Sequence, residues 1–351
     1  DMGNEIDFVY KSFIWNSDAN LKAHVHCIIV GFSSTSVTTN KVIYDNGSES
    51  KVSNINAYQI EAENIFIESR NKSISGAKPM IAPNKPCDYN HLKIEATEYD
   101  DFIKSSPESA KWIKRMVGAK EFIQNKERYC LWLVGITPKE LRSMPIVLDR
   151  VEKCREARIN ANTSESLKLA NTPTLFREQL NPDKYLIIPC VSSERRKYVP
   201  IGFLDDKTIP VMGTLIVPDA DLLDLGILTS NVHMAWMRTV AGRLEMRYRY
   251  SAQIVYNNFP WPELTEEQKS KISKTAQAIL DARALYPDSS LADLYDELTM
   301  PVELRRAHQA NDKAIMEAYG MTKVVDGKRT WLTESETVAR LFEMYEKLTE
   351  K

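Results

Sequence analysis

Charged side chains stand at every second position in part of the segment Gly242–Ser251, GRLEMRYRYS. If this segment is an extended strand, Glu245, Arg247 and Arg249 point to one face, and the side chains between them point to the other. Arginine donates two hydrogen bonds to O6 and N7 of guanine, and a carboxylate accepts one from N4 of cytosine. The pattern therefore suits the reading of base edges in the major groove of DNA. A salt-bridged surface strand would show the same spacing, so the pattern alone leaves both interpretations open.

Motifs for catalysis and for nucleotide binding are absent from the sequence. It contains no glycine-rich loop for a methyl donor, no Asp/Asn-Pro-Pro-aromatic loop, no GxGxxG motif, no P-loop and no GxSxG elbow. The prolines of Tyr256–Pro262, YNNFPWP, are separated, which favours a rigid connector over a catalytic loop. His24 and His26 would share a strand face, but no spacing supplies further metal ligands. We therefore assign no catalytic residue and no metal site.

The charge is distributed unevenly along the 351 residues. The whole chain has a net charge of −2, whereas residues 263–351 alone have −4. The stretch Trp236–Tyr250 contains four arginines and one glutamate, so a surface that binds a polyanion is expected there. The five cysteines form no CxxC pair, and neither a long apolar run nor a signal peptide is present. These features predict a cytoplasmic protein with free thiols.

Hydrophobic periodicity predicts a mixture of strands and helices before residue 262. Short apolar runs predict buried strands at Ala23–Phe32, Tyr129–Val134, Tyr185–Pro189, Pro200–Leu204 and Thr214–Val217. Helical spacing is found at Pro138–Ser143, Pro145–Asn160 and Leu222–Val240. Residues 33–50 are rich in Ser, Thr, Asn and Gly and are interpreted as a linker, and prolines argue against a helix over Ile254–Pro262.

The sequence after Pro262 is predominantly helical in pattern. Thr265–Gln268 and Thr333–Glu336 have the form of capping boxes, and Pro301 can occupy the start of another helix. Apolar residues follow each capping box on one helical face: Ile272, Ala276, Ile279 and Leu280 after the first, and Val338, Leu341, Phe342, Tyr345 and Leu348 after the second.

Several blocks, in order along nearly the whole chain, resemble the MmeI-like restriction–methyltransferases. GRLEMRYRYS resembles the family's GRL(E/K)x(R/D)YRYS element. Further similar blocks are SSERRKYVPIGFL, LTSNVHMAWMRTVAGRL, YSAQIVYNNFPWP, AQAILDARALYPDSSLADLY and, near the N-terminus, IWNSDANLKAHVHCIIVGF. The resemblance implies an α+β fold in three parts. Residues 1–45 would be the last piece of a methyltransferase domain with a linker, 46–262 a mixed α/β target-recognition domain, and 263–351 a small all-α C-terminal domain.

The function implied by the resemblance is recognition of a double-stranded DNA sequence. The chain would direct a bacterial adenine-N6 DNA methyltransferase of a restriction–modification system to its site. Its partners would be DNA and the remainder of its own polypeptide, with no membrane. S-adenosylmethionine would be the cofactor of the parent enzyme, and this chain would bind none and be inactive alone. A module for protein interaction, or a DNA clamp without base readout, is the alternative.

The resemblance also implies individual contact residues. The base-reading positions fall at Cys190, Met212, Gly213, Glu245, Arg247 and Arg249. Glu245 and Arg247 would read one C·G pair beside the methylated adenine. The small or apolar residues at the first three positions would leave room for a longer side chain or contact a thymine methyl group.

Contacts to DNA phosphates are expected from a basic cluster and from arginines that flank GRLEMRYRYS. These residues are Ser192, Ser193, Arg195, Arg196, Lys197, Arg238 and Arg243. A solvated charged surface is the alternative for the basic cluster, and it is the favoured interpretation of the charged helix Arg150–Arg158.

Overall fold

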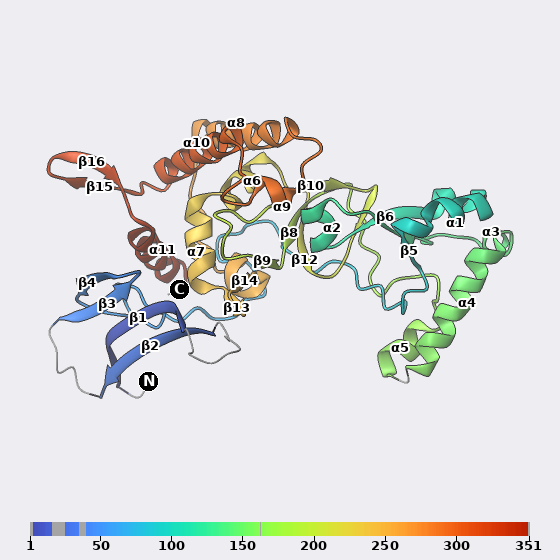
Figure 1. The fold of residues 1–351 in the computed structure, drawn as a ribbon, viewed down its shortest axis with the longest axis horizontal. Coiled ribbons are helices and arrows are strands. Elements are labelled where there is room, and N and C mark those ends of the chain that lie inside the picture. Colours follow the sequence, from blue (N-terminus) through green and yellow to red (C-terminus); the bar gives the residue numbers. More distant parts are fainter. Residues whose placement is uncertain (1–2, 16–24, 35–39, 162, 350–351) are drawn as a thin grey trace. The chain divides into compact units, whose positions relative to one another are not determined.

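The computed structural model describes residues 3–15, 25–34, 40–161 and 163–349, and His24 therefore lies outside the described residues. Contacts within the chain divide it into two compact units. Unit 1 comprises residues 1–77, 230–275 and 308–351, and unit 2 comprises 78–229 and 276–307. Helices alternate with small sheets in the described part of the chain (Figure 1), which confirms the α+β class.

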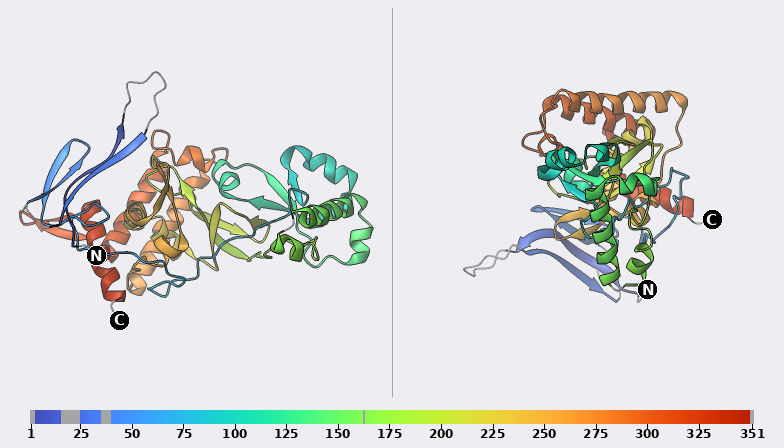
Figure 2. Two further views of the ribbon diagram at one scale, coloured as in Figure 1. Left: turned by 90° about the horizontal axis from the view of Figure 1, so that it is seen from below. Right: turned by 90° about the vertical axis from the view of Figure 1, so that its right-hand side faces the viewer.

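Unit 1 begins with a four-stranded sheet in the order β2-β1-β3-β4. Its strands are β1 (Glu5–Trp15), β2 (Val25–Ser33), β3 (Lys41–Asp45) and β4 (Ser48–Val52). The long antiparallel pair β1–β2 lies beside the shorter β3–β4 pair (Figures 1 and 2). One face of the sheet packs Val9, Ile43 and Val52 against Ile55.

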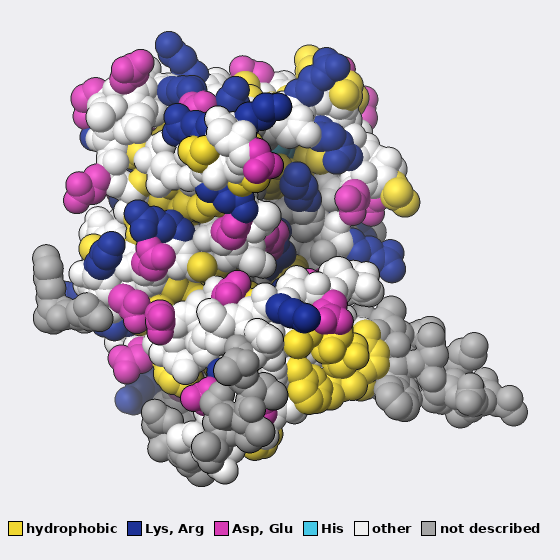
Figure 3. All heavy atoms as spheres, turned by 90° about the vertical axis from the view of Figure 1, so that its left-hand side faces the viewer, with side chains coloured by type: hydrophobic (Ala, Val, Ile, Leu, Met, Phe, Trp, Pro, Cys, Tyr) yellow, Lys and Arg dark blue, Asp and Glu magenta, His cyan; other side chains and the backbone are white. Residues whose placement is uncertain are grey.

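The strand predicted at Ala23–Phe32 is confirmed as β2, but the prediction that it is buried is wrong. Ile28, Ile29 and Phe32 are 51%, 45% and 65% exposed. β2 is an edge strand, paired on the side of β1, and these side chains are not covered by other described segments. A patch of apolar side chains is visible on the face of the molecule that Figure 3 shows.

The linker predicted for residues 33–50 is wrong over its second half, which forms the β3–β4 hairpin. Asn46 and Gly47 make its two-residue turn, with φ values of 48° and 81°. Asn-Gly is a favoured pair for such turns because both residues tolerate positive φ. The polar composition of residues 33–50 suggested a linker, although Asn46–Gly47 is a specific signal for a hairpin turn.

The middle part of unit 1 contains a helix, a short hairpin and a π-helix. These are α7 (Asn231–Val240), β13 (Gly242–Leu244), β14 (Arg247–Arg249) and η3 (Ala252–Tyr256). The expectation that Ile254–Pro262 is not helical is wrong up to Tyr256, because Pro260 is too far along the chain to disturb that turn. From Asn257 onward the segment is non-helical as expected.

The helices expected after Pro262 are present as α8 (Glu266–Ala284), α9 (Leu291–Leu294), α10 (Val302–Ala318) and α11 (Glu334–Thr349). Both capping boxes form, with Gln268 N 3.3 Å from Thr265 Oγ1 and Glu336 N 3.4 Å from Thr333 Oγ1. The apolar stripe of α11 is buried except for Leu348. The C-terminal region is helical, and it also contains an unpredicted hairpin of β15 (Thr322–Val325) and β16 (Lys328–Trp331), turned at Asp326–Gly327.

Unit 2 contains two sheets within its own residues. An antiparallel sheet has the order β10-β8-β12, from Gly202–Asp205, Lys184–Pro189 and Thr214–Pro218. A mixed sheet has the order β11-β6-β7-β5, from Thr208–Pro210, Ile113–Val117, Arg128–Leu131 and Lys93–Glu95. The short strand β9 is Val191–Ser192. These strands confirm the apolar runs predicted in this region.

The helices of unit 2 are mostly short. Those before residue 230 are η1 (Ala96–Glu98), α1 (Tyr99–Ser105), η2 (Pro107–Trp112), α2 (Ala119–Gln124), α3 (Pro138–Arg142), α4 (Pro145–Asn160), α5 (Ser164–Leu169) and α6 (Leu222–Leu228), and α9 also belongs to this unit. The single helix expected at Leu222–Val240 is thus two helices, α6 and α7. The break occurs because the Ser230 side chain caps α7 by accepting from His233 N. No described helix is long and apolar enough to cross a membrane.

Arg158 of α4 departs from the solvated surface favoured for this helix. Its side chain is fully buried and donates to five backbone carbonyl oxygens. The acceptors belong to Pro86, Cys87, Leu169, Thr172 and Leu175. Because these carbonyls come from two separate segments, Arg158 ties both segments to α4.

Candidate nucleic-acid interface

The segment Gly242–Ser251 forms a hairpin and not the single extended strand that was expected. β13 pairs antiparallel with β14, and Leu244 lies opposite Arg247. Glu245 and Met246 form the turn between them, and Glu245 has a φ of 57°. The alternation expected from Glu245 through Arg249 is therefore broken at Glu245, because a turn residue does not continue the pleat of a strand.

Strand β14 itself has the expected alternation of faces. Arg247 and Arg249 are exposed, whereas Tyr248 and Tyr250 are 8% and 4% exposed. The register places Gly242 and Leu244 opposite the two arginines, so these residues share the exposed face. The hairpin thus exposes the guanidinium groups of Arg247 and Arg249, and it packs against the protein through Tyr248 and Tyr250.

The structure brings the predicted pair Glu245 and Arg247 together at the end of the hairpin. Arg247 Nη2 lies 2.7 Å from Glu245 Oε2, and the two side chains are 46% and 77% exposed. An ion pair this exposed contributes little to stability, because water screens both charges. Both side chains therefore remain available to other hydrogen-bonding groups.

The buried end of β14 is anchored to helix α7. The hydroxyl of Tyr250 lies 2.8 Å from Nε2 of His233, and both residues are buried. Burial lowers the pKa of His233 to about 3, so the ring is neutral at physiological pH. Phe259 packs edge-on against the His233 ring at 4.5 Å between centroids. The exposed hairpin is consequently mounted on a tightly packed aromatic cluster.

Three other predicted base-reading residues lie together in unit 2. Cys190 N donates to Gly213 O at 2.9 Å, where β8 has ended and β12 is about to begin. Gly213 has a φ of 94°, a conformation that favours glycine. Met212 is 61% exposed beside it. The six candidates therefore form two groups of three, one in each unit.

The basic cluster predicted to contact phosphate is only partly exposed. Arg195 and Lys197 are exposed, and Ser193 Oγ accepts from Arg195 N at 3.2 Å. Arg196 is half-buried, and burial lowers the pKa of its guanidinium, against the opposing effect of Asp296. Ser192, in strand β9, is buried at 3% exposure, so its hydroxyl is not presented to DNA in this structure.

The two arginines that flank the hairpin have partners within unit 1. Arg238 forms a bidentate ion pair with Glu334 of α11, at 2.8 Å from Nε and 2.9 Å from Nη2. Arg243 donates from Nη1 to Met246 O at 3.0 Å, and its guanidinium lies 3.8 Å from the ring centroid of Tyr248. Both side chains are thus engaged with the protein.

Comparison with known proteins supplies a family for this geometry. Residues 61–263 match the family described as "MmeI, target recognition domain". Residues 264–351 match "MmeI, C-terminal domain", and residues 1–45 match "MmeI, DNA-methyltransferase domain". The chain belongs to the MmeI family. The resemblance inferred from the sequence blocks is therefore confirmed.

Two relatives of this MmeI-family chain show how much of a longer protein it matches. The structure of the type IIL restriction–modification enzyme MmeI in complex with DNA has 41% sequence identity and a TM-score of 0.87, over 99% of this chain and 46% of that one. DNA methyltransferase A of Bacillus subtilis (strain 168) is 36% identical over 350 residues, which are 99% of this chain and 39% of that protein. The chain spans less than half the length of either relative.

His233 is the residue of this MmeI-family site that sequence reasoning missed. No catalytic or metal-binding motif of the sequence includes it, yet it supports the hairpin through Tyr250. The available signal was its position within the otherwise apolar run Val232–Met237, whose side chains are all buried in the structure. A polar ring in so apolar a helix face needs a partner.

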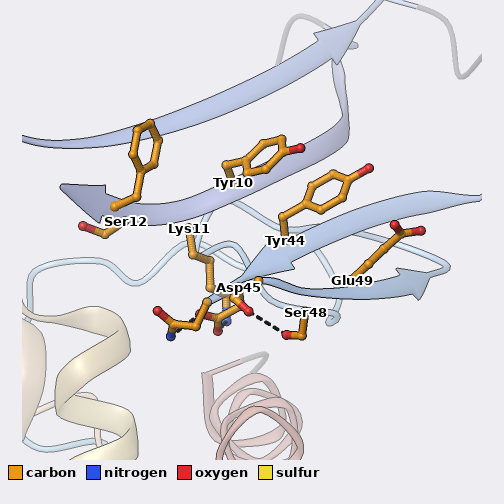
Figure 4. Close-up of a pocket in the computed structure, with 10 residues that line it drawn as sticks. Tyr10, Lys11, Ser12, Tyr44, Asp45, Ser48 and Glu49 are labelled. Carbon is orange, nitrogen blue, oxygen red and sulfur yellow. Dashed lines mark hydrogen bonds and ion pairs between the residues drawn. The ribbon is translucent and has the colours of Figure 1, made fainter. Parts of the chain in front are cut away.

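A cavity of about 760 Å³ on the N-terminal sheet contains none of the predicted DNA-reading residues. Tyr10 and Tyr44 stack at 4.1 Å between ring centroids, and Lys11 Nζ lies 3.2 Å from Asp45 Oδ2 (Figure 4). The cavity is formed by the segment Tyr10–Phe13 and the β3–β4 hairpin. We assign it no part in DNA reading.

Proposed function

We propose that this chain recognises a double-stranded DNA sequence and directs the methyltransferase of a restriction–modification enzyme to it. The observation that carries the proposal is the β13–β14 hairpin, which is exposed at its turn and anchored at its base. The hairpin holds an acceptor and a donor fork side by side at 2.7 Å. A two-stranded ribbon of this kind fits the width of the major groove.

Glu245 and Arg247 are proposed to read one C·G base pair. The guanidinium of Arg247 would donate to O6 and N7 of guanine, and the carboxylate of Glu245 would accept from N4 of cytosine. Because the two side chains already touch, they can address the two bases of a single pair. Arg249 lies on the same face two residues further along the strand and would address a neighbouring position.

The group in unit 2 is proposed to read bases through shape and apolar contact. Met212 is exposed at a tight turn and has the chemistry to contact the C5 methyl group of thymine. Cys190 and Gly213 hold this turn by their backbone hydrogen bond and contribute little side-chain bulk. Arg195 and Lys197 are the exposed cations best placed in their loop to contact phosphate.

The parent enzyme is proposed to methylate adenine at N6 with S-adenosylmethionine bound outside this chain. The match of residues 1–45 to "MmeI, DNA-methyltransferase domain" supports a methyltransferase, and the resemblance of the sequence blocks to MmeI-like enzymes is the basis for adenine N6 and for this cofactor. The remainder of the methyltransferase domain would cover strand β2, whose Ile28, Ile29 and Phe32 are exposed at a sheet edge. Exposed apolar edge strands of this length are normally covered in a complete domain.

The decisive test is to select duplexes from a randomised DNA library by their binding to the 351-residue chain, and to sequence the bound DNA. We expect a single enriched motif that contains a C·G pair at one position. Equal recovery of all sequences would refute base reading and favour a DNA clamp without sequence preference. Recovery of no DNA at low salt would refute DNA binding by the isolated chain.

A double substitution then tests the assignment of the pair. In the variant Glu245→Lys with Arg247→Asp, donor and acceptor exchange places, so the enriched pair should change from C·G to G·C. The other positions of the motif should stay the same. Arg340→Lys, in α11 of the same unit, serves as the control and should leave the whole motif unchanged. A double variant that keeps C·G would show that these residues do not read the pair.

A further inference from the structure

Arg243 is the member of the hairpin whose contacts do not match a phosphate-binding role. Its guanidinium stacks on Tyr248 and donates to the carbonyl of Met246. We infer that Arg243 is a positioning residue that holds the Glu245–Met246 turn, so that it sets base discrimination and not overall DNA affinity. The inference rests on the proposed function of the hairpin.

The stacking contact with Tyr248 restrains the side chain of Arg243. Arg243 and Tyr248 are directly paired residues of β13 and β14, and the distance from the guanidinium carbon to the ring centroid is 3.8 Å. Tyr248 is itself buried, so its ring cannot follow a mobile arginine. Cation–π stacking of a planar guanidinium on a fixed ring restrains both the position and the plane of the group.

The hydrogen bond carries this restraint to the turn. Arg243 Nη1 donates to O of Met246 at 3.0 Å, and Met246 is the second residue of the turn. The first residue, Glu245, has a positive φ of 57° without being glycine, asparagine or aspartate. Such a conformation is unfavourable for a residue with a long side chain and persists where the surroundings hold it.

The hairpin has little else to hold its turn. Each of its strands is three residues long, and its packed anchor, the contact between Tyr250 and His233, lies at the end of β14 away from the turn. The ion pair between Glu245 and Arg247 is exposed and therefore weak. A base-reading pair must be placed accurately to discriminate, so the Arg243 clamp would act through the position of Glu245.

Lysine offers a sharp test, because it keeps the charge of Arg243 but has no planar fork. A phosphate contact tolerates lysine, whereas a clamp that both stacks and hydrogen-bonds does not. Tyr248→Leu removes the ring but keeps Arg243, and Tyr248→Phe keeps the ring as its matched control. Arg340→Lys controls for an arginine-to-lysine change elsewhere in unit 1.

The measurement is the dissociation constant, by fluorescence anisotropy, for the selected duplex and for three duplexes changed only at the pair assigned to Glu245 and Arg247. Arg243→Lys and Tyr248→Leu should each reduce discrimination at that pair by about tenfold. They should leave the slope of log Kd against log salt as in wild type. Tyr248→Phe and Arg340→Lys should retain wild-type discrimination.

A phosphate-binding role of Arg243 would give a different result. If Arg243→Lys keeps full discrimination while Arg243→Gln lowers the salt slope by about one, Arg243 is a phosphate contact and the inference is wrong. Circular dichroism would show whether Tyr248→Leu folds, and if it does not, Arg243→Lys alone decides. A wild-type chain that selects no motif would refute the proposed function, which is a different failure.

Discussion

Lowering the pH should weaken unit 1 through one residue, the buried His233. The pKa of this ring is about 3 in the folded protein because burial disfavours the charged form, and the ordinary value is 6.5. Below pH 6.5 the unfolded chain takes up a proton that the folded chain refuses. The free energy of unfolding is therefore unaffected by this histidine above pH 6.5, and it falls progressively as the pH decreases towards 3. At pH 5 the loss amounts to about 2 kcal/mol.

The assay is urea unfolding followed by tryptophan fluorescence at pH 7 and pH 5. Trp236 is a suitable reporter because it is buried in the same helix as His233 and donates to Val255 O at 2.9 Å. The control is His233→Gln, whose side-chain amide can still hydrogen-bond to Tyr250 but does not titrate. Other titrating groups are common to both proteins and cancel in the comparison.

The expected result is that wild type loses about 2 kcal/mol more than His233→Gln between pH 7 and pH 5. Equal losses in the two proteins would refute the reasoning. That outcome would mean that the His233 ring accepts a proton in the folded state, and that the buried contact with Tyr250 is not the rigid base of the hairpin described above.

Three further substitutions have defined outcomes. Arg158→Met should lower the free energy of unfolding of unit 2 by about 3–5 kcal/mol, since five carbonyl oxygens lose a buried charged donor; chemical denaturation measures this. Gly47→Ala should cost about 1 kcal/mol, because φ is 81° there, and differential scanning calorimetry would detect it. Glu334→Gln should cost at most about 1 kcal/mol and leave DNA affinity by anisotropy unchanged, as the Arg238 ion pair is partly exposed.

Local signals with a direct physical cause were predictable from the sequence. The capping boxes at Thr265 and Thr333 formed because a side-chain oxygen and a backbone N–H three residues apart meet in the first helical turn. The core strand at Tyr185–Pro189 formed because a continuous apolar run must be buried on both faces. These signals depend on neighbours in the sequence and on little else.

Features that depend on the partner segment were not predictable in the same way. The apolar composition of β2 suggested burial, but burial requires other segments packed over the side chains, and Ile28, Ile29 and Phe32 of this edge strand are exposed. Arg158 looked like one charge among many on α4, and only the folded chain brings five carbonyl groups around it. The sequence contains the donor but does not show where the acceptors gather.

The hairpin illustrates both cases within a few residues. Alternation correctly predicted that Arg247 and Tyr248 lie on opposite faces, because a period of two is a property of any strand. It failed at Glu245, where the chain turns, since glutamate gives no turn signal of the kind that Asn46–Gly47 gives. The positive φ of Glu245 is set by the paired strands and by the Arg243 contact at Met246.

The position of Glu245 in the turn has a functional consequence. A glutamate on the strand would project parallel to Arg247, with its carboxylate at a fixed spacing along the ribbon. A glutamate in the turn reaches Arg247 from the end of the hairpin, and the two groups meet at 2.7 Å. The two arrangements place the acceptor differently relative to the donor fork, and in the second the two groups touch, which suits the reading of two bases of a single pair. The strained turn therefore belongs to the proposed reading mechanism, and any substitution that relaxes it should broaden specificity before it weakens binding.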